Sequence, residues 1–293
     1  MNLAFAGAKF VVLEDRGVLA IGGPDRASFL QGLVSNDAAK ISPQRAIYAA
    51  LLTAQGKYLH DFMLVEIGGT IWLDGEAARL ADLKRRLTMY RLRSKVTIDE
   101  RPDLAVTALH GGDVLGEPGA AEPLGDGVVF TDPRLAALGA RAILPHEQIG
   151  GTLRDKGATP GDFAEYDRLR LELGVPDGSR DLMLDKSILL ESGFEELHGV
   201  DWEKGCYIGQ ELTARTKYRG LIKKRLFPVR IDGPAPEAGT IVTLDGQEAG
   251  EMRSSRGGTG LALLRLEAVG KNRLMAGDAC IVPTMPAWMR LPD

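Results

Sequence analysis

The spacing of apolar residues changes along the chain from a helical period to a strand period and back. Between residues 76 and 92 apolar side chains recur at steps of three and four, which predicts an amphipathic helix. The same spacing predicts a second helix over 162–173. The runs 46–52 and 58–67 are typical of strands, and the turn 53–57 joins them. The apolar residues of the first helix are Ala77, Leu80, Leu83, Leu87 and Tyr90.

After Arg225 the pattern changes to short apolar runs that are separated by glycine and proline. Regular short strands of this kind predict a small β-barrel. Upstream, strands and helices alternate, which is typical of α+β modules. The segment 111–140 is rich in Gly, Pro and Ala and is predicted to be a variable loop. Barrel strands are expected at 226–231, 239–244, 248–253 and 259–266.

The 293-residue chain is 44% apolar and 26% charged, as in an ordinary globular protein. At roughly 100–150 residues per domain, this length predicts two or three domains. No segment approaches the roughly 20 apolar residues that are needed to cross a bilayer. Residues 1–10 lack the apolar core of a secretory signal. We therefore expect a cytoplasmic protein with no membrane partner.

The chain has only two cysteines, Cys206 and Cys280, and they are far apart in the sequence. This number excludes a disulfide framework, and it also excludes a zinc or cluster site built from this chain's cysteines alone. Cys206 is expected to be a free thiol in a reducing compartment.

Positive charge is concentrated in two segments, although the net charge of the chain is −4. Residues 84–95 and 215–225 each hold six basic and no acidic side chains. Two such segments in an acidic body indicate a local anion site or, equally, two solvated faces. In the second segment, Arg215, Lys217 and Arg219 could attract a protein partner or an anion such as RNA phosphate, and electrostatic attraction does not discriminate among these.

The segment 204–211, KGCYIGQE, places one thiol between two glycines and near a lysine. Glycines permit tight turns and close approach of a partner, and a nearby cation favours the thiolate that attacks electrophiles and binds metals. A free cysteine can equally be a small buried hydrophobic residue, so both interpretations stay open. The residues of this motif on which we focus are Lys204, Gly205, Cys206, Tyr207, Gly209, Gln210 and Glu211.

KGCYIGQE and the following LTARTKYRG resemble the signature of the YgfZ family of folate-binding proteins, which includes a mitochondrial factor for maturing four-iron clusters. The resemblance covers most of the chain, whereas the last 60 residues resemble the family only in general character and contain no matching motif. Further matching stretches are FLQGLVSND (29–37), YAALLTAQGKYLHDF (48–62), YRLRSKVTI (90–98) and LRLELGVPDG (169–178).

This resemblance implies the α+β fold of the glycine cleavage T-protein, with two α+β modules and a small C-terminal β-barrel around a central folate-binding channel. We expect a discontinuous first module of residues 1–50 and 146–222 and a second module of residues 51–145. The barrel is expected over 223–293.

The resemblance also implies a set of tetrahydrofolate contacts. A superfamily pair of adjacent aspartates reads His60-Asp61 here, which leaves Asp61 as the one carboxylate and puts aminomethyl transfer in doubt. Glu172 matches the glutamate that binds the pterin ring, because a carboxylate accepts two parallel hydrogen bonds from its amidine-like edge. The other expected folate contacts are Asn36, Asp37, Tyr90 and Arg91.

Three functions follow as hypotheses. The first is an iron–sulfur cluster assembly or repair factor that binds tetrahydrofolate without turning it over. Cys206 would then supply one ligand of a cluster that is shared with a scaffold or client protein. The second is a folate-dependent one-carbon transferase or demethylase, with Cys206 and Asp61 as the predicted catalytic residues. The third is an RNA-binding module linked to tRNA modification, in which Tyr90 and Tyr218 stack on bases.

Overall fold

The computed structural model describes residues 4–112, 116–220, 222–271 and 273–291, and it separates into two compact units. Unit 1 comprises residues 1–52, 60–166 and 198–208, and unit 2 comprises 53–59, 167–197 and 209–293. The domain boundaries expected from the sequence stay a prediction. No helix in the described ranges is both long enough and apolar enough to span a membrane.

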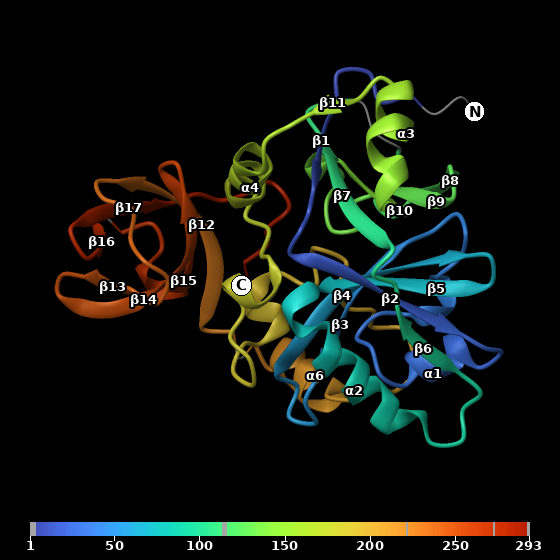
Figure 1. Cartoon of the computed structure of the whole chain (residues 1–293). Helices are drawn as coiled ribbons and strands as arrows, with labels where there is room; N and C mark the ends of the chain where they lie inside the picture. The colour runs from blue at the N-terminus through green and yellow to red at the C-terminus, as the bar shows by residue number, and fades with distance from the viewer. Residues whose placement is uncertain (1–3, 113–115, 221, 272, 292–293) are drawn as a thin grey trace. The chain divides into compact units, whose positions relative to one another are not determined.

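Unit 1 contains two sheets (Figure 1). The first has the order β11-β1-β7-β10-β9-β8, and among the described residues its strands pair antiparallel except β1 with β11. Phe5, Phe10 and Leu109 fill its core together with Ile149 and Leu153 of the covering helix α3. The elements are β1 (Lys9–Val12), β7 (Leu104–His110), β8 (Ala121–Leu124), β9 (Gly127–Thr131), β10 (Ala140–Pro145), α3 (Ile149–Asp155) and β11 (Thr159–Pro160).

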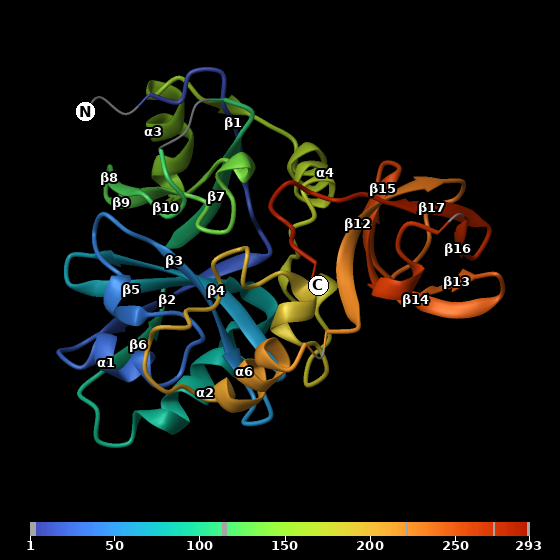
Figure 2. The same cartoon turned by 180° about the vertical axis from the view of Figure 1, so that it is seen from behind.

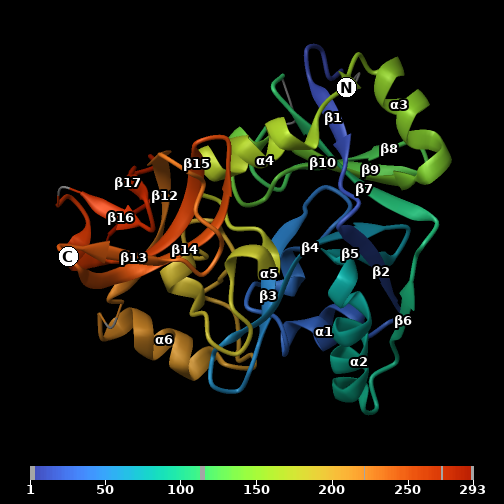
Figure 3. The ribbon, with the colours of Figure 1, turned by 60° about the vertical axis from the view of Figure 1, so that its left-hand side comes forward.

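The second sheet has the order β3-β4-β5-β2-β6. Every residue of β3 is buried, as are the first eight of β4, so this part of the sheet is covered on both faces. Helix α2 lies against β2 and β6 through Leu80, Leu83 and Leu87 (Figure 3). The elements are β2 (Arg16–Gly22), α1 (Arg26–Gln31), η1 (Ala38–Lys40), β3 (Ile47–Leu52), β4 (Tyr58–Ile67), β5 (Thr70–Glu76), η2 (Ala77–Arg79), α2 (Leu80–Arg91) and β6 (Thr97–Glu100).

Buried ion pairs connect the two sheets of unit 1. The Asp74 carboxylate on β5 accepts hydrogen bonds from Arg16 at 2.7 Å and from Arg141 of β10 at 2.5 Å. Asp132 accepts from Arg134 at 2.7 Å and lies 3.7 Å from Arg141. Because all of these side chains are buried, each charge depends on its neighbours for compensation.

Unit 2 contains the barrel, which is closed in the order β12-β15-β14-β13-β16-β17. Phe227, Val229, Val242, Met252 and Leu264 are among the side chains that fill it. The elements are β12 (Lys224–Asp232), β13 (Ile241–Leu244), β14 (Gln247–Arg256), β15 (Thr259–Arg265), η6 (Leu266–Ala268), β16 (Leu274–Ala276) and β17 (Ala279–Pro283), preceded by α5 (Gly178–Asp181), η5 (Leu189–Ser192) and α6 (Gln210–Tyr218). Helix α4 (Phe163–Glu172) begins in unit 1 and ends in unit 2.

The predicted helices and the first four barrel strands are confirmed, whereas two details of the sequence interpretation are wrong. The segment 111–140 is not a loop, because it contains β8 and β9, which pair beside β10 (Figure 2). The helix predicted over 76–92 starts as the short η2, and both Ala77 and Tyr90 are exposed. The buried stripe of this helix is therefore shorter than the spacing predicted.

Arg170 of α4 is the largest of the fully buried side chains in the described part of the chain, and it lies in unit 2. Its guanidinium donates to Asp167 at 2.8 Å, to Asp181 at 2.6 Å, to Ser254 of β14 at 2.8 Å and to the Val175 carbonyl at 3.3 Å. This arginine therefore joins α4 and α5 to the barrel.

We predict that Arg170→Met lowers the free energy of unfolding by about 3–5 kcal/mol, because it leaves buried carboxylates at Asp167 and Asp181 without this cation. Urea titration followed by circular dichroism measures the change. Arg168→Met is the matched control on the same helix, since its pair with Glu172 is exposed and is worth at most about 1 kcal/mol. Equal losses in the two variants would contradict this role of the buried ion pairs.

Candidate functional site

Cys206 lies in an irregular segment that precedes α6. Its thiol is free and exposed, as is the neighbouring Gly205, whereas Lys204 and Tyr207 on either side are buried. The alternative of a cysteine sealed in apolar packing is therefore wrong. The segment presents one sulfur to solvent and anchors itself through the residues beside it.

The Lys204 ammonium holds this loop to the segment that follows α1. Its Nζ donates to the carbonyl oxygens of Gln31 at 2.8 Å, Val34 at 2.6 Å and Asn36 at 2.8 Å. It also lies 4.9 Å from the centroid of the Tyr207 ring. Three acceptors match the three hydrogens of an ammonium group, so these contacts make Lys204 a positioning residue. Its predicted effect on the thiolate stays a prediction.

Burial sets the electrostatics of this anchor. It lowers the pKa of Lys204 to about 8, although Asp37 and Asp201 act in the opposite direction. Above that pH the neutral amine has two hydrogens for three carbonyl acceptors, so one acceptor loses its partner. The anchor is therefore complete only while the lysine is charged.

Asp201 closes the turn that leads to the cysteine. Its carboxylate accepts from Lys40 at 2.5 Å and from the backbone N–H groups of Glu203 at 2.8 Å and Lys204 at 3.1 Å. Burial raises the pKa of Asp201, but these hydrogen bonds outweigh it and the pKa is lowered. An aspartate that bonds its own backbone two and three residues on stabilises a turn locally.

Ser35 supplies further bonds between the same two segments. Its hydroxyl donates to the Gly199 carbonyl at 2.5 Å and accepts from the Ala50 N–H at 2.8 Å. Its own carbonyl accepts from the Asp201 N–H at 3.0 Å. The backbone that carries Cys206 is thus tied to the segment after α1 at several successive positions.

Asn36 and Asp37, two of the predicted folate contacts, lie in this tied region. The Asn36 amide donates to the carbonyls of Tyr48 at 2.8 Å and His198 at 2.7 Å and accepts from the Asp37 N–H at 2.7 Å. The Asp37 carboxylate accepts from the Ala39 N–H at 3.0 Å at the start of η1. Both amide hydrogens of Asn36 are therefore used by backbone.

His60 and Asp61 point to opposite faces of β4, as adjacent strand residues do. His60 Nε2 lies 2.9 Å from an Asp82 oxygen on α2, and burial together with the charge of Arg79 lowers its pKa. Asp61 is buried and accepts from the Tyr48 hydroxyl at 2.8 Å. The imidazole of His60 therefore contacts Asp82 on α2, whereas the carboxylate of Asp61 contacts Tyr48.

Tyr48 links Asp61 to the cysteine motif. Its hydroxyl donates to Asp61, and its carbonyl accepts from Asn36, whose own carbonyl accepts from Lys204. The Arg134 guanidinium lies 5.6 Å from the centroid of the Tyr48 ring. The structure thus brings Asn36, Asp61 and Lys204 into one connected set within unit 1, and Tyr48 is the member that the sequence analysis missed.

The remaining predicted folate contacts are solvated. Tyr90 and Arg91 are the exposed last two residues of α2 in unit 1. Glu172 ends α4 in unit 2, and its half-exposed carboxylate accepts from Arg168 at 2.9 Å.

The turn between β3 and β4 contacts the start of α6 within unit 2. A Cβ at Gly56, which has φ +68°, would lie only 3.0 Å from the Gly209 carbonyl oxygen and 3.2 Å from the Leu212 Cβ, so the close contact requires glycine. Gly209 precedes α6 at φ +83°, where glycine is favoured. Glu211 lies in the first turn, 3.6 Å from Arg215, and no hydrogen bond from a side chain caps this helix among the described residues.

The motif residue Gln210 is half-buried as the first residue of α6. Within the described ranges no three His, Cys, Asp or Glu side chains are grouped to hold a metal ion. The motif thus offers one sulfur ligand and no complete metal site.

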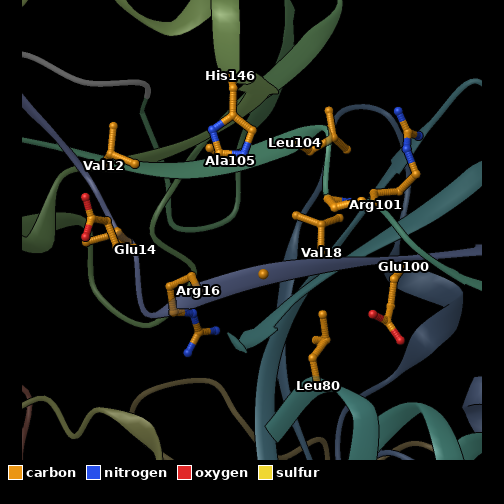
Figure 4. Close-up of a pocket in the computed structure, with 13 residues that line it drawn as sticks. Val12, Glu14, Arg16, Val18, Leu80, Glu100, Arg101, Leu104, Ala105 and His146 are labelled. Carbon is orange, nitrogen blue, oxygen red and sulfur yellow. The ribbon is translucent and has the colours of Figure 1, made fainter. Parts of the chain in front are cut away.

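A cavity of about 450 Å³ lies between the two sheets of unit 1 (Figure 4). Val12, Val18 and Leu104 contribute apolar surface, and its two arginines already pair, Arg16 with Asp74 and Arg101 with Asp103. None of the predicted site residues lines it in the part of the chain that the structure describes.

Comparisons with known proteins agree with this architecture. A family model described as the CAF17 C-terminal beta-barrel domain matches residues 223–291. The glycine cleavage system aminomethyltransferase T from Bartonella henselae superposes with a TM-score of 0.78 at 17% identity, covering 97% of this chain and 87% of that one. The fold is therefore that of the glycine cleavage T-protein, as predicted.

Sequence relatives are more specific. The mitochondrial iron–sulfur cluster assembly factor IBA57 of Mus musculus is 36% identical over 305 residues, covering 94% of this chain and 84% of the relative. The Homo sapiens factor is 36% identical over 302 residues with the same coverage. The Neurospora crassa homologue is 31% identical over 241 residues, covering 77% of this chain and 54% of the relative.

These relatives overturn one expectation from the sequence. The mouse, human and Neurospora crassa proteins are all named as mitochondrial, so the expectation of a cytoplasmic protein is wrong. The similarity to the two mammalian factors extends over 94% of the chain. The chain therefore belongs to the IBA57 family of iron–sulfur cluster assembly factors.

Proposed function

We propose that this protein acts in iron–sulfur cluster assembly or repair and that Cys206 donates one ligand to a cluster shared with a scaffold or client protein. The observation that carries the proposal is the exposed thiol of Cys206. Its loop is fixed by the hydrogen bonds of Lys204 to backbone carbonyls and of Asp201 to backbone N–H groups. A fixed loop presents its sulfur to a partner in one geometry, so little conformational entropy is lost on docking.

Ligand count requires the partner. Clusters are usually held by four thiolates, whereas this chain has two cysteines in separate elements. Coordination by Cys206 forms one sulfur–iron bond while the bond from that iron to one of its earlier ligands breaks. The thiol proton passes to the displaced ligand or to solvent, and the remaining ligands come from the partner. The cluster is cargo in this scheme, and no electron transfer is needed for the exchange of ligands.

We further assign the chain to the YgfZ type within this fold and propose that it binds tetrahydrofolate. The support is the KGCYIGQE motif together with the T-protein fold. Asp61, Glu172, Asn36 and Asp37 remain the proposed contacts. Folate turnover is the less favoured alternative, because His60 replaces the second carboxylate and is engaged with Asp82.

We predict that Cys206→Ser abolishes the shared cluster, because a hydroxyl is a poor ligand for iron in place of a thiolate. The variant and its scaffold protein are mixed under anaerobic conditions, desalted and measured by visible absorbance and iron content. Cys280→Ser is the matched control, since this second cysteine lies in β17 of the barrel, and it retains the cluster. Retention by Cys206→Ser at the wild-type level would remove the thiol from the mechanism.

Lys204→Met tests the anchor separately from the thiol. We expect the free energy of unfolding to fall by about 1–3 kcal/mol for buried carbonyls left without a donor. Hydrogen exchange of the amides in residues 201–206 should accelerate, and cluster retention should fall although Cys206 is intact. Lys223→Met, at an exposed lysine, is the control and should change neither quantity. Unaltered exchange in Lys204→Met would show that the loop is held by other contacts.

Folate binding is tested by thermal unfolding with folinic acid or tetrahydrofolate. A ligand that binds only the folded state stabilises it by about 2.7 kcal/mol at 100 times its Kd. We expect the melting temperature to rise, and Asp61→Asn or Glu172→Gln to reduce the rise. Glu248→Gln, at an exposed glutamate of the barrel, should respond as the wild type does. A flat titration into the millimolar range would refute the folate site.

A further inference from the structure

The C-terminal end of α2 presents apolar side chains to solvent. Met89 is 64% exposed, Tyr90 45% and Leu92 88%, the largest exposure among the large apolar residues of the described chain. Figure 3 shows that this end of α2 and the loop after it extend beyond the sheet on which the helix packs. We call residues 89–95 the α2 tip.

The same tip carries positive charge that the chain does not neutralise. On the body of α2, Arg85 and Arg86 pair with Asp82, and Lys84 lies 3.4 Å from Glu100. In the tip, by contrast, no ion pair is recorded among the described residues for the side chains of Arg91, Arg93 and Lys95. Three cations without an ion pair among the described residues therefore lie in the same short segment as the three exposed apolar side chains.

The backbone holds the tip in this conformation at a cost. Leu92 adopts φ +43° and ψ −108°, which a residue with a Cβ rarely does. The Asp25 carboxylate accepts from the Lys95 N–H at 2.7 Å, and the Ser94 N–H donates to the Arg91 carbonyl at 2.8 Å. A strained residue that is kept exposed by its surroundings is typical of sites that contact a ligand or partner.

We propose that the α2 tip is the surface to which the iron–sulfur scaffold protein binds. The matching face of the scaffold protein is acidic and has an apolar centre. This inference rests on the proposed function, since it assigns the surface by which the cluster partner is held. Leu92, Met89 and Tyr90 provide apolar anchors of the kind found at the centres of interfaces, where Tyr, Met and Arg are enriched. Arg91, Arg93 and Lys95 steer an acidic partner and reject a basic one.

The charge of the chain favours a protein over a polyanion. Three cations neutralise about three phosphates, whereas nucleic-acid binders commonly use about six to ten contacts. Apolar side chains exposed to 64% and 88% also gain nothing from a phosphate backbone, but they gain from burial against protein.

The test measures the Kd between the full-length chain and the purified scaffold protein by isothermal titration at fixed salt. Leu92→Gly removes the apolar anchor and relieves the positive φ, so this variant folds at least as stably as the wild type. We expect Leu92→Gly and Arg93→Glu each to raise the Kd at least tenfold. Lys271→Glu, the same charge reversal at an exposed site near the barrel, should change it less than twofold.

Four outcomes are distinguishable. Selective weakening by the two tip variants, with Cys206→Ser binding the cluster-free scaffold as tightly as the wild type, supports the docking surface. Wild-type affinity in both tip variants overturns it and leaves the role of Cys206 standing. Absence of scaffold binding and of a shared cluster in the wild type overturns the docking surface and the proposed function together. Tip-dependent binding to single-stranded RNA or phosphatidylglycerol vesicles, without scaffold binding, overturns it in favour of those ligands.

Discussion

The hydrogen bonds that the Lys204 ammonium donates to the carbonyls of Gln31, Val34 and Asn36 join two segments that are far apart in the sequence. Without them the loop that carries Cys206 would depend on its own short turn, the Ser35 contacts, the pair of Asp201 with Lys40 and the bond from Asn36 to the His198 carbonyl. A buried ammonium is costly to desolvate, and the shared acceptors offset that cost only in the native geometry. The position of the exposed sulfur therefore depends on a residue two places away that never needs to contact a partner.

The same segment after α1 also connects to Asp61 through Tyr48 and Asn36. Asp61 and the cysteine loop are consequently parts of one polar network in unit 1, although they come from a strand and from a late irregular segment. The network gives Asn36 a structural reason to be present that is independent of any ligand. It also shows why His60 does not restore a second acid, because that side chain belongs to the opposite face of β4.

Much of the fold could be predicted because periodic patterns and turn residues report it directly. The barrel strands through Arg265 and the helices α2 and α4 follow this rule. β8 and β9 lie in a Gly- and Pro-rich segment and could not be predicted from it. Short paired strands can be stabilised by contacts with neighbouring strands rather than by their own composition. Tyr90 fits the apolar spacing of α2 but lies beyond the sheet edge, and spacing alone does not report where a helix loses its packing partner.

The motif of the site could be predicted from the sequence, whereas the hydrogen-bond partners of the motif could not. Cys206 and Lys204 were found from the sequence, whereas the partners Asp201, Ser35 and Tyr48 become visible only when distant segments meet. Single polar residues of this kind carry no periodic signal. Their roles depend on three-dimensional proximity, which composition and spacing do not encode.

The paired charges between the sheets of unit 1 carry a consequence for how this lineage can diverge. Replacing Asp74 alone leaves the largely buried side chains of Arg16 and Arg141 without their shared carboxylate, whereas exchanging the whole group for apolar residues of similar volume can be neutral. Intermediates with one or two changes are thus selected against, so neutral drift cannot reach the apolar version stepwise. Homologous sequences should keep or lose Arg16, Asp74 and Arg141 together.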